Sequence, residues 1–224
     1  MQPMTEKHLA VFRRHMVEVV DIHFELAADE IGKPRPDERV RDAMVAVPRH
    51  LFVPAQLAGI AYHDGPLPIG FDKTISQPFI AALMLDLLEV QPGSHVLEVG
   101  TGLGYQAAVL AELRADVWSV EIVEEFAGAA SQRLLQLGYQ VNVRVGDGSR
   151  GWSEHAPYDR ILVTAAAKIP PPALVEQLKP GGRMVLPLGG KEVQQLSVVE
   201  KGQWGQISTR EVMSVRFTQL ETMA

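Results

Sequence analysis

Residues 95–106 place the strongest constraint on the fold of this 224-residue chain. The apolar run 95–99 leads directly into Gly100, Gly102 and Gly104, and a helix-forming segment follows. Alternate glycines let the backbone turn sharply and approach a ligand closely, and the free N–H groups at the start of the next helix can face it. The pattern therefore predicts a strand, a nucleotide-binding loop and a helix, in that order.

The spacing of these glycines argues against a dinucleotide site. A fingerprint of the form G-x-G-x-x-G would need glycine or alanine at Tyr105, whereas the chain has G-x-G-x-G. Glu121 closes a second apolar run, and Asp147 with Gly148 follows a third. An acid at the tip of the second strand suits both hydroxyls of an unphosphorylated ribose. A carboxylate beside the same cleft can accept a hydrogen bond from an exocyclic amine, such as that of adenine.

The glycines and the two acids together resemble the S-adenosylmethionine site of class I methyltransferases. A glycine turn alone can also be a tight strand-to-helix connection, but three matched strand ends favour a cofactor site. Strand and helix patterns alternate up to about residue 190, which predicts an α/β fold with a doubly wound, mostly parallel Rossmann-like sheet. The expected strands are 95–99, 117–121, 141–145, 159–165 and 183–188, followed by an antiparallel C-terminal end at 194–200 and 212–218.

The N-terminal part of the chain predicts helices. Residues 8–31 are expected to form one long helix, and Asp37 is a plausible N-cap for a second. Residues 59–78 are rich in Gly, Pro and aromatic residues and predict an irregular segment of a kind that is usually functional. We therefore expect a helical extension over 1–58, packed on the core, and one catalytic methyltransferase domain over 59–224.

Charge and composition argue against several classes of protein. With 21 Lys and Arg against 27 Asp and Glu, the net charge is −6, a field that repels nucleic acid. There is no cysteine, so disulfides and thiolate chemistry are excluded. The seven histidines show no ligand cluster and no close acid partner, which predicts structural or surface roles and no metal site. No signal-peptide pattern and no apolar run of ~20 residues occurs, so we expect a cytoplasmic protein without a membrane partner.

A second informative stretch, Thr74-Ile75-Ser76-Gln77-Pro78, lies ahead of the glycine loop. Together with Val47-Pro48-Arg49-His50, the glycine loop, Gly146-Asp147-Gly148 and Val163-Thr164-Ala165-Ala166-Ala167, it resembles the protein-L-isoaspartate (D-aspartate) O-methyltransferase family. The resemblance covers roughly residues 40–220. The T-I-S-Q-P element is much more specific than the glycine loop, which the whole superfamily shares.

The resemblance implies the repair of aged proteins. Asparagine deamidation and aspartate isomerisation pass through a succinimide that opens mostly to a β-linked isoaspartate, whose α-carboxylate is left free. The family methylates that carboxylate with S-adenosylmethionine, forming S-adenosylhomocysteine, and the ester then recyclises to the succinimide. The carboxylate is already ionised at neutral pH, so positioning and exclusion of water should supply the rate without a general base. The expected partners are isoaspartyl proteins and peptides.

The resemblance also implies roles for individual residues. Ser76 would be the catalytic-site serine that orients the isoaspartyl carboxylate, although a Ser before Gln-Pro can instead be a helix N-cap. Glu98 would help to hold the cofactor's amino group through water, or would cap the glycine loop. The cofactor-binding residues would be Thr74, Ile75, Glu98, Gly100, Thr101, Gly102, Gly104, Glu121, Asp147 and Gly148. The substrate side would be lined by Ser76, Val163, Thr164 and Ala165.

Two features depart from the family, and two other classes of function stay open. The N-terminal helix is longer than expected, and Phe79 stands where some relatives have a histidine that touches the cofactor. Arg216, on the expected closing strand, could attract a peptide carboxylate or face solvent. The other classes are a methyltransferase of the same fold with a different small-molecule carboxylate or other acceptor, and a non-catalytic binding module. The oligomeric state is not predicted.

Overall fold

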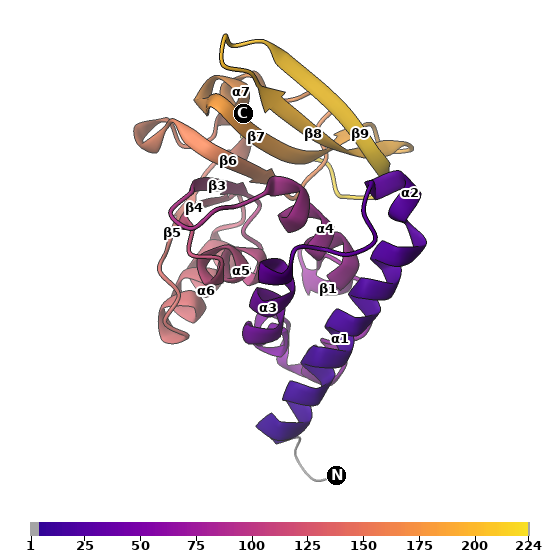
Figure 1. Ribbon diagram of the computed structural model, residues 1–224. Helices are drawn as coiled ribbons and strands as arrows, with labels where there is room; N and C mark the ends of the chain where they lie inside the picture. Colours follow the sequence, from indigo (N-terminus) through magenta and orange to yellow (C-terminus); the bar gives the residue numbers. More distant parts are fainter. Residues whose placement is uncertain (1–4, 224) are drawn as a thin grey trace.

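A seven-stranded sheet forms the centre of the molecule, in the strand order β5-β4-β3-β6-β7-β8-β9. The computed structural model describes residues 5–223. Residues 1–4 belong to the N-terminus in which no signal peptide is expected, and they lie outside the described residues. Adjacent pairs from β5 to β7 are parallel, and β8 and β9 complete the sheet as antiparallel neighbours, as predicted (Figure 1). The strands are β3 (His95–Val99), β4 (Asp116–Glu121), β5 (Val141–Val145), β6 (Tyr158–Val163), β7 (Leu178–Gly189), β8 (Gln194–Lys201) and β9 (Ile207–Val215).

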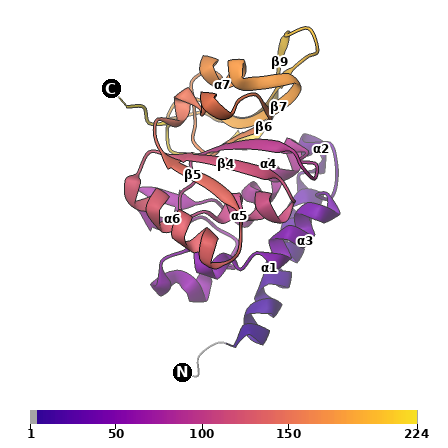
Figure 2. The same ribbon diagram turned by 90° about the vertical axis from the view of Figure 1, so that its left-hand side faces the viewer.

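Helices cover both faces of this sheet (Figures 1 and 2). One face carries α4 (Pro78–Leu88), α5 (Tyr105–Glu112) and α6 (Glu124–Gln136), while α7 (Pro172–Gln177) lies on the other. From β3 the chain passes to β4 on one side and later to β6 on the other. The carboxyl end of β3 is therefore the point at which strand order reverses, where open α/β sheets bind their ligands.

The N-terminal helices form a further layer on the face of the sheet that carries α4, α5 and α6. The expected helix 8–31 is in fact two, α1 (Glu6–Leu26) and α2 (Ala28–Ile31), because Ala27 leaves helical geometry at φ −101° and ψ 15°. As predicted, Asp37 caps α3 (Glu38–Ala46), since its carboxylate accepts a hydrogen bond from Arg39 N. Two 3₁₀ helices follow, η1 (Arg49–Phe52) and η2 (Ala55–Ile60). None of the helices within residues 5–223 is long and apolar enough to cross a membrane.

The segment expected to be irregular contains a β-hairpin, so that expectation was wrong. Strands β1 (Leu67–Gly70) and β2 (Lys73–Ile75) pair in antiparallel fashion. Their turn places Phe71 and Asp72 at φ +50° and +54°, a left-handed geometry that is rare for phenylalanine, and neither position has the glycine that usually marks such a turn. The predicted strand 212–218 is also shifted, because β9 runs from Ile207 to Val215 and leaves Arg216 in the segment that follows.

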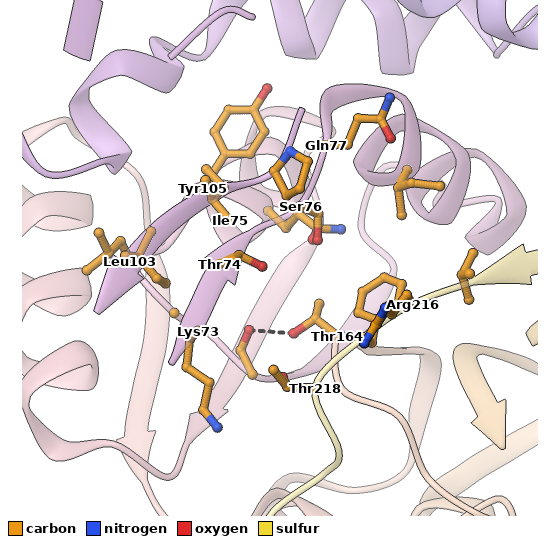
Figure 3. Close-up of a pocket in the computed structure, with 18 of the residues that line it drawn as sticks. Lys73, Thr74, Ile75, Ser76, Gln77, Leu103, Tyr105, Thr164, Arg216 and Thr218 are labelled. Carbon is orange, nitrogen blue, oxygen red and sulfur yellow. Dashed lines mark hydrogen bonds between the residues drawn. The ribbon is translucent and has the colours of Figure 1, made fainter. Parts of the chain in front are cut away.

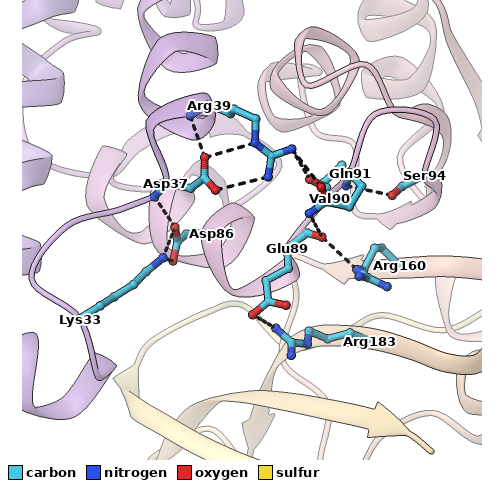
Figure 4. Close-up of polar contacts among 10 residues, drawn as sticks. All are labelled: Lys33, Asp37, Arg39, Asp86, Glu89, Val90, Gln91, Ser94, Arg160 and Arg183. Atoms are coloured by element: carbon cyan, nitrogen blue, oxygen red, sulfur yellow. Dashed lines mark hydrogen bonds and ion pairs between the residues drawn. The ribbon is translucent and has the colours of Figure 1, made fainter. Parts of the chain in front are cut away.

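A polar network joins α4 to the N-terminal layer and to the sheet (Figure 4). The buried carboxylate of Asp86 accepts hydrogen bonds from Lys33 Nζ and Asp37 N, both at 2.7 Å. At the end of the same helix, Arg183 pairs with Glu89 at 2.6 Å and donates to the Leu87 carbonyl at 3.0 Å. These contacts fix α4, whose N-cap residue Gln77 directly follows Ser76.

Candidate active site

A cavity of about 980 Å³ opens at the carboxyl end of β3. It lies between the β1–β2 hairpin, the glycine loop and residues 213–219, which comprise the end of β9 and the chain directly after it (Figure 3). In Figure 3, Thr74 and Ser76 come from the hairpin side, and Thr164, Arg216 and Thr218 come from the opposite side. Of the residues predicted from the sequence, its lining includes Thr74, Ile75, Ser76, Glu98, Gly100, Thr101, Gly102 and Thr164.

A smaller cavity of about 90 Å³ adjoins the first and brings in the second and third strand ends. Thr74, Gly100, Gly102 and Thr164 border both cavities. The predicted residues that line only the smaller one are Glu121, Gly148 and Ala165. The hairpin, the glycine loop and three strand ends therefore surround one continuous region.

Gly100 and Gly104 have different reasons for being glycine. Gly100 has φ +93°, and a Cβ there would stand 2.3 Å from Thr164 Oγ1, which donates to the Gly100 carbonyl at 2.8 Å. Gly104, at φ +94°, is the N-cap of α5, and a Cβ there would press on Ala130 and Leu134 at 3.3–3.4 Å. Gly104 thus lets two helices approach each other and does not line either cavity.

Glu98 is completely buried at the base of the larger cavity. Its Oε2 accepts a hydrogen bond from Ser119 Oγ at 2.5 Å, and Ser119 Oγ also lies 2.6 Å from Thr101 Oγ1. Its Oε1 has no partner within the described residues. Burial raises the pKa of Glu98 to about 8, against the hydrogen bond from Ser119, which lowers it. An unpartnered oxygen of this kind, in the wall of a cavity, fits a cationic amino group, and such a cation would favour the ionised form of Glu98.

Glu121, not Glu98, caps the glycine loop. Its Oε2 accepts from Gly102 N at 2.7 Å and its Oε1 from Val123 N at 2.9 Å. No such bond from the loop to Glu98 occurs in the part of the chain that the structure describes, so the capping alternative for Glu98 was wrong. Glu121 also borders the smaller cavity, so the same residue fixes the glycine loop and lines the cavity.

Asp147, expected to bind the cofactor, lines neither cavity, although the next residue, Gly148, borders the smaller one. The Asp147 carboxylate is engaged by its own chain. Its Oδ1 accepts from Ser149 N at 2.9 Å and Ser149 Oγ at 2.6 Å, and its Oδ2 from Met223 N at 3.1 Å. Burial alone would raise the pKa of Asp147, but these hydrogen bonds and the nearby Arg150 guanidinium lower it. The carboxylate therefore stays ionised as an acceptor.

A buried arginine, Arg49, fixes the main-chain carbonyl of Ser76. Arg49 Nη2 donates to the Ser76 carbonyl at 2.7 Å and Arg49 Nε donates to the Ala61 carbonyl at 2.8 Å. The guanidinium lies 4.9 Å from the centre of the Tyr105 ring. The N-cap of α4 is Gln77, and no side chain caps that helix, so the N-cap alternative for Ser76 was wrong. The motif containing Arg49 was visible in the sequence, but its contact with Ser76, 27 positions away, was not.

The sequence missed His23 as a residue of the cavity. His23 reaches the lining from α1, and its ring stacks on that of Phe79, with centroids 4.9 Å apart. The expectation that the histidines lack acid partners was wrong for at least three of them. His23 contacts Asp64 at 2.6 Å, His15 contacts Glu18 at 3.2 Å and His95 contacts Asp116 at 2.8 Å.

Val163 and Arg216 occupy opposite environments. Val163, expected on the substrate side, is completely buried in the core and lines neither cavity. Arg216 follows the last strand and lines the larger cavity (Figure 3). A cationic side chain at the mouth of the cavity suits an anionic peptide.

Comparison with known proteins identifies this arrangement. A family model described as protein-L-isoaspartate (D-aspartate) O-methyltransferase matches residues 26–223. Protein-L-isoaspartate O-methyltransferase 1 of Polaromonas sp. strain JS666 is 51% identical over 97% of this chain and 93% of its own. Protein-L-isoaspartate O-methyltransferase 2 of Syntrophobacter fumaroxidans is 53% identical over 93% of this chain and 85% of its own.

Solved structures agree with this assignment. One described as a protein-L-isoaspartate O-methyltransferase superposes with a TM-score of 0.75 at 28% identity, over 89% of this chain and 65% of that one. A Plasmodium falciparum structure, in complex with S-adenosyl-L-homocysteine, has a TM-score of 0.76 at 22% identity, over 94% of this chain and 99% of that one, and so supports the fold.

The fold and the three strand ends define an S-adenosylmethionine-dependent methyltransferase. Within that class, the chain belongs to the protein-L-isoaspartate (D-aspartate) O-methyltransferase family. It is accordingly an enzyme that methylates isoaspartyl residues of proteins and peptides.

Proposed function

We propose that methyl transfer to the isoaspartyl α-carboxylate takes place in the 980 Å³ cavity and that Ser76 orients the carboxylate there. The observation that carries this proposal is the position of Ser76. Its carbonyl is fixed by Arg49, while in the described residues its hydroxyl forms no bond that caps α4. The hydroxyl is therefore held beside the cavity with its donor available to a ligand.

The surrounding residues fit S-adenosylmethionine, which when bound supplies a methyl group on a positively charged sulfur. The unpartnered Oε1 of Glu98 suits the amino group of its methionine part. Gly100 and Gly102 line the same cavity, so the backbone of the glycine loop borders that part. Glu121 borders the smaller cavity, where it would take the ribose hydroxyls, with Gly148 and Asp147 beside the adenine.

The residues of the cavity do three things for the reaction in this proposal. Ser76 donates to one carboxylate oxygen and leaves the other free to attack. Phe79, Ile75 and the apolar part of the glycine loop exclude water that would otherwise solvate the nucleophile. Arg216 and Lys191, which also line the cavity, attract an acidic segment of a peptide. No side chain is needed to remove a proton, because an isoaspartyl carboxyl group is ionised at neutral pH.

Two peptides test the proposal. They are identical except that one has an L-isoaspartyl linkage and the other an L-aspartyl linkage, and methyl transfer from labelled S-adenosylmethionine is scored as base-labile methanol. We expect transfer to the isoaspartyl peptide alone. Transfer to neither peptide, with the cofactor still bound in calorimetry, would indicate a different carboxylate or other acceptor.

The serine is tested separately with Ser76→Ala. Loss of a donor to the reacting carboxylate should lower kcat/KM by about 10²-fold and leave cofactor affinity unchanged. The matched control is Ser208→Ala, an exposed serine on β9, which should behave as the parent enzyme. Full activity of Ser76→Ala would remove Ser76 from the mechanism.

A further inference from the structure

Gln77 lines the cavity directly after Ser76, and its amide orientation is fixed by a carboxylate. Gln77 Nε2 donates to Asp64 Oδ1 at 2.9 Å. An ionised carboxylate only accepts hydrogen bonds, so the amide must turn its NH₂ group toward Asp64 and its oxygen away. No donor within the described residues reaches Gln77 Oε1. The cavity wall therefore carries a free acceptor next to the serine donor.

Asp64 is in turn held by the N-terminal layer. Its second oxygen, Oδ2, lies 2.6 Å from His23 Nε2. The His23 ring stacks on Phe79 at 4.9 Å with an interplanar angle of 28°. Three separate elements, the end of α1, the loop before β1 and the start of α4, thus converge on one chain of contacts from His23 through Asp64 to Gln77. This chain holds the Nε2 side of the Gln77 amide and leaves its oxygen free.

The chemistry of isoaspartate explains what such an acceptor can read. In an isoaspartyl residue the N–H and the free carboxylate are bonded to the same α-carbon, because the chain continues through the β-carbon. In a normal aspartyl residue the free carboxylate is one carbon further from the N–H. A donor and an acceptor fixed on consecutive residues can therefore distinguish the two linkages by the spacing between carboxylate and N–H.

We propose that Gln77 is a specificity-determining residue whose Oε1 accepts a hydrogen bond from the N–H of the isoaspartyl residue, while Ser76 holds its α-carboxylate. Asp64 and His23 are positioning residues that keep the Gln77 amide in this orientation. The inference rests on the proposed function of Ser76 and deepens it, since it names the substrate atoms that the neighbouring residue recognises.

The experiment removes this hydrogen bond first by replacing the donor in the substrate and then by replacing the acceptor in the enzyme. One isoaspartyl peptide has the normal amide, and its matched depsipeptide has an ester oxygen in place of the isoaspartyl N–H. The parent enzyme should lose about 3- to 10-fold in kcat/KM on the depsipeptide. Gln77→Met should lose a similar factor on the amide peptide and differ by less than about twofold between the two peptides. An equal depsipeptide loss in both enzymes would overturn the proposal.

The positioning residues are tested by the ratio of kcat/KM values for the amide peptide and the depsipeptide. Asp64→Ala and His23→Ala should lower this ratio toward that of Gln77→Met. His23→Gln should restore it, because a glutamine amide can still donate to Asp64. His15→Ala, an exposed histidine on the same helix, should leave the ratio unchanged. Parent-like ratios in both Asp64→Ala and His23→Ala would remove the positioning role.

The controls separate this inference from the function on which it depends. Melting temperature and cofactor affinity are measured for every variant, and if Asp64→Ala does not fold, the Gln77→Met comparison decides alone. Activity of the parent enzyme on neither peptide would contradict the proposed function itself. Activity that depends on Ser76 but shows no coupling between Gln77 and the isoaspartyl N–H would contradict only the role of Gln77.

Discussion

Burial raises the pKa of Glu98, so the effect of this residue on stability can be tested by varying the pH. Its pKa in the folded protein is about 8, above the ordinary value of 4.5. The folded state therefore binds more protons than the unfolded state between these values, so Glu98 lowers stability as pH rises from about 4.5 to 8. The Glu98→Gln variant should gain stability relative to the parent over that range, by at most ~1.4 kcal/mol per pH unit.

Urea unfolding at pH 5, 6.5 and 8 measures this difference. The matched control is Glu112→Gln, an exposed acid at the end of α5, whose difference from the parent should not change with pH. A constant difference between Glu98→Gln and the parent would contradict the buried, protonated state of Glu98.

Arg49 gives a second prediction at the scale of one residue. Arg49→Met leaves the carbonyls of Ser76 and Ala61 without donors but also removes a buried charge, so we expect a net loss of only ~1–3 kcal/mol of stability. The folded variant should also lose activity at saturating peptide, because Arg49 no longer fixes the Ser76 carbonyl. Arg14→Met, exposed on α1, should change neither melting temperature nor methyl transfer. Full activity of a folded Arg49→Met variant would contradict the anchoring role.

Residue types at strand ends could be predicted from the sequence, but contacts between distant segments could not. Gly100, Glu121 and Gly148 lie where local spacing placed them, since each follows an apolar run in a parallel sheet. His23 has no such signal, because its partner Asp64 is 41 positions away and the two meet only when α1 packs beside the loop before β1. Val163 was misplaced because the last residue of a strand can point into the core as readily as into the cleft.

At the scale of elements, α4 is held by the carboxylate of Asp86 as well as by its apolar surface. Asp86→Ala would leave Asp37 N without its acceptor and would break the pair with Lys33, which is partly exposed. We expect a loss of ~1–3 kcal/mol in the free energy of unfolding. Asp42→Ala, an exposed acid on α3, should change it by less than about 0.5 kcal/mol. Equal urea midpoints for the two variants would show that the network in Figure 4 contributes nothing to stability.

Elements were predictable where hydrophobic period and caps agreed. The strands β3 and β5 and the helix α4 coincide with apolar runs bounded by turn residues. Asp37, as an N-cap residue, indicates the start of α3. The β1–β2 hairpin was missed because its turn uses Phe71 and Asp72 in left-handed geometry without a glycine at either position. The break at Ala27 was missed because alanine favours helix, so its residue type gives no sign that the helix ends there.

At the scale of the whole molecule, the C-terminal segment closes the site that the parallel strands open. After β9, at one edge of the sheet, the chain returns across the strand ends. Gln219 pairs with Ala166 beyond β6, Glu221 forms an ion pair with Lys73 of the hairpin, and Met223 N reaches Asp147 beyond β5. Alternating strands and helices predicted the parallel sheet, but nothing local in the sequence indicates this return path.

A chain shortened after Leu220 tests what this segment does. Glu221 lines the smaller cavity, so loss of the segment should expose bound cofactor and raise the dissociation rate of S-adenosylhomocysteine on the order of tenfold. The melting temperature without cofactor should hardly change, because the Glu221 side chain of the lost ion pair is exposed to water. Stopped-flow displacement measures the rate, with Glu221→Gln as a milder variant and the exposed Glu192→Gln as the matched control. Slower dissociation would mean that Met223 N competes with the adenine amine for Asp147, and that the segment opposes cofactor binding instead of retaining it.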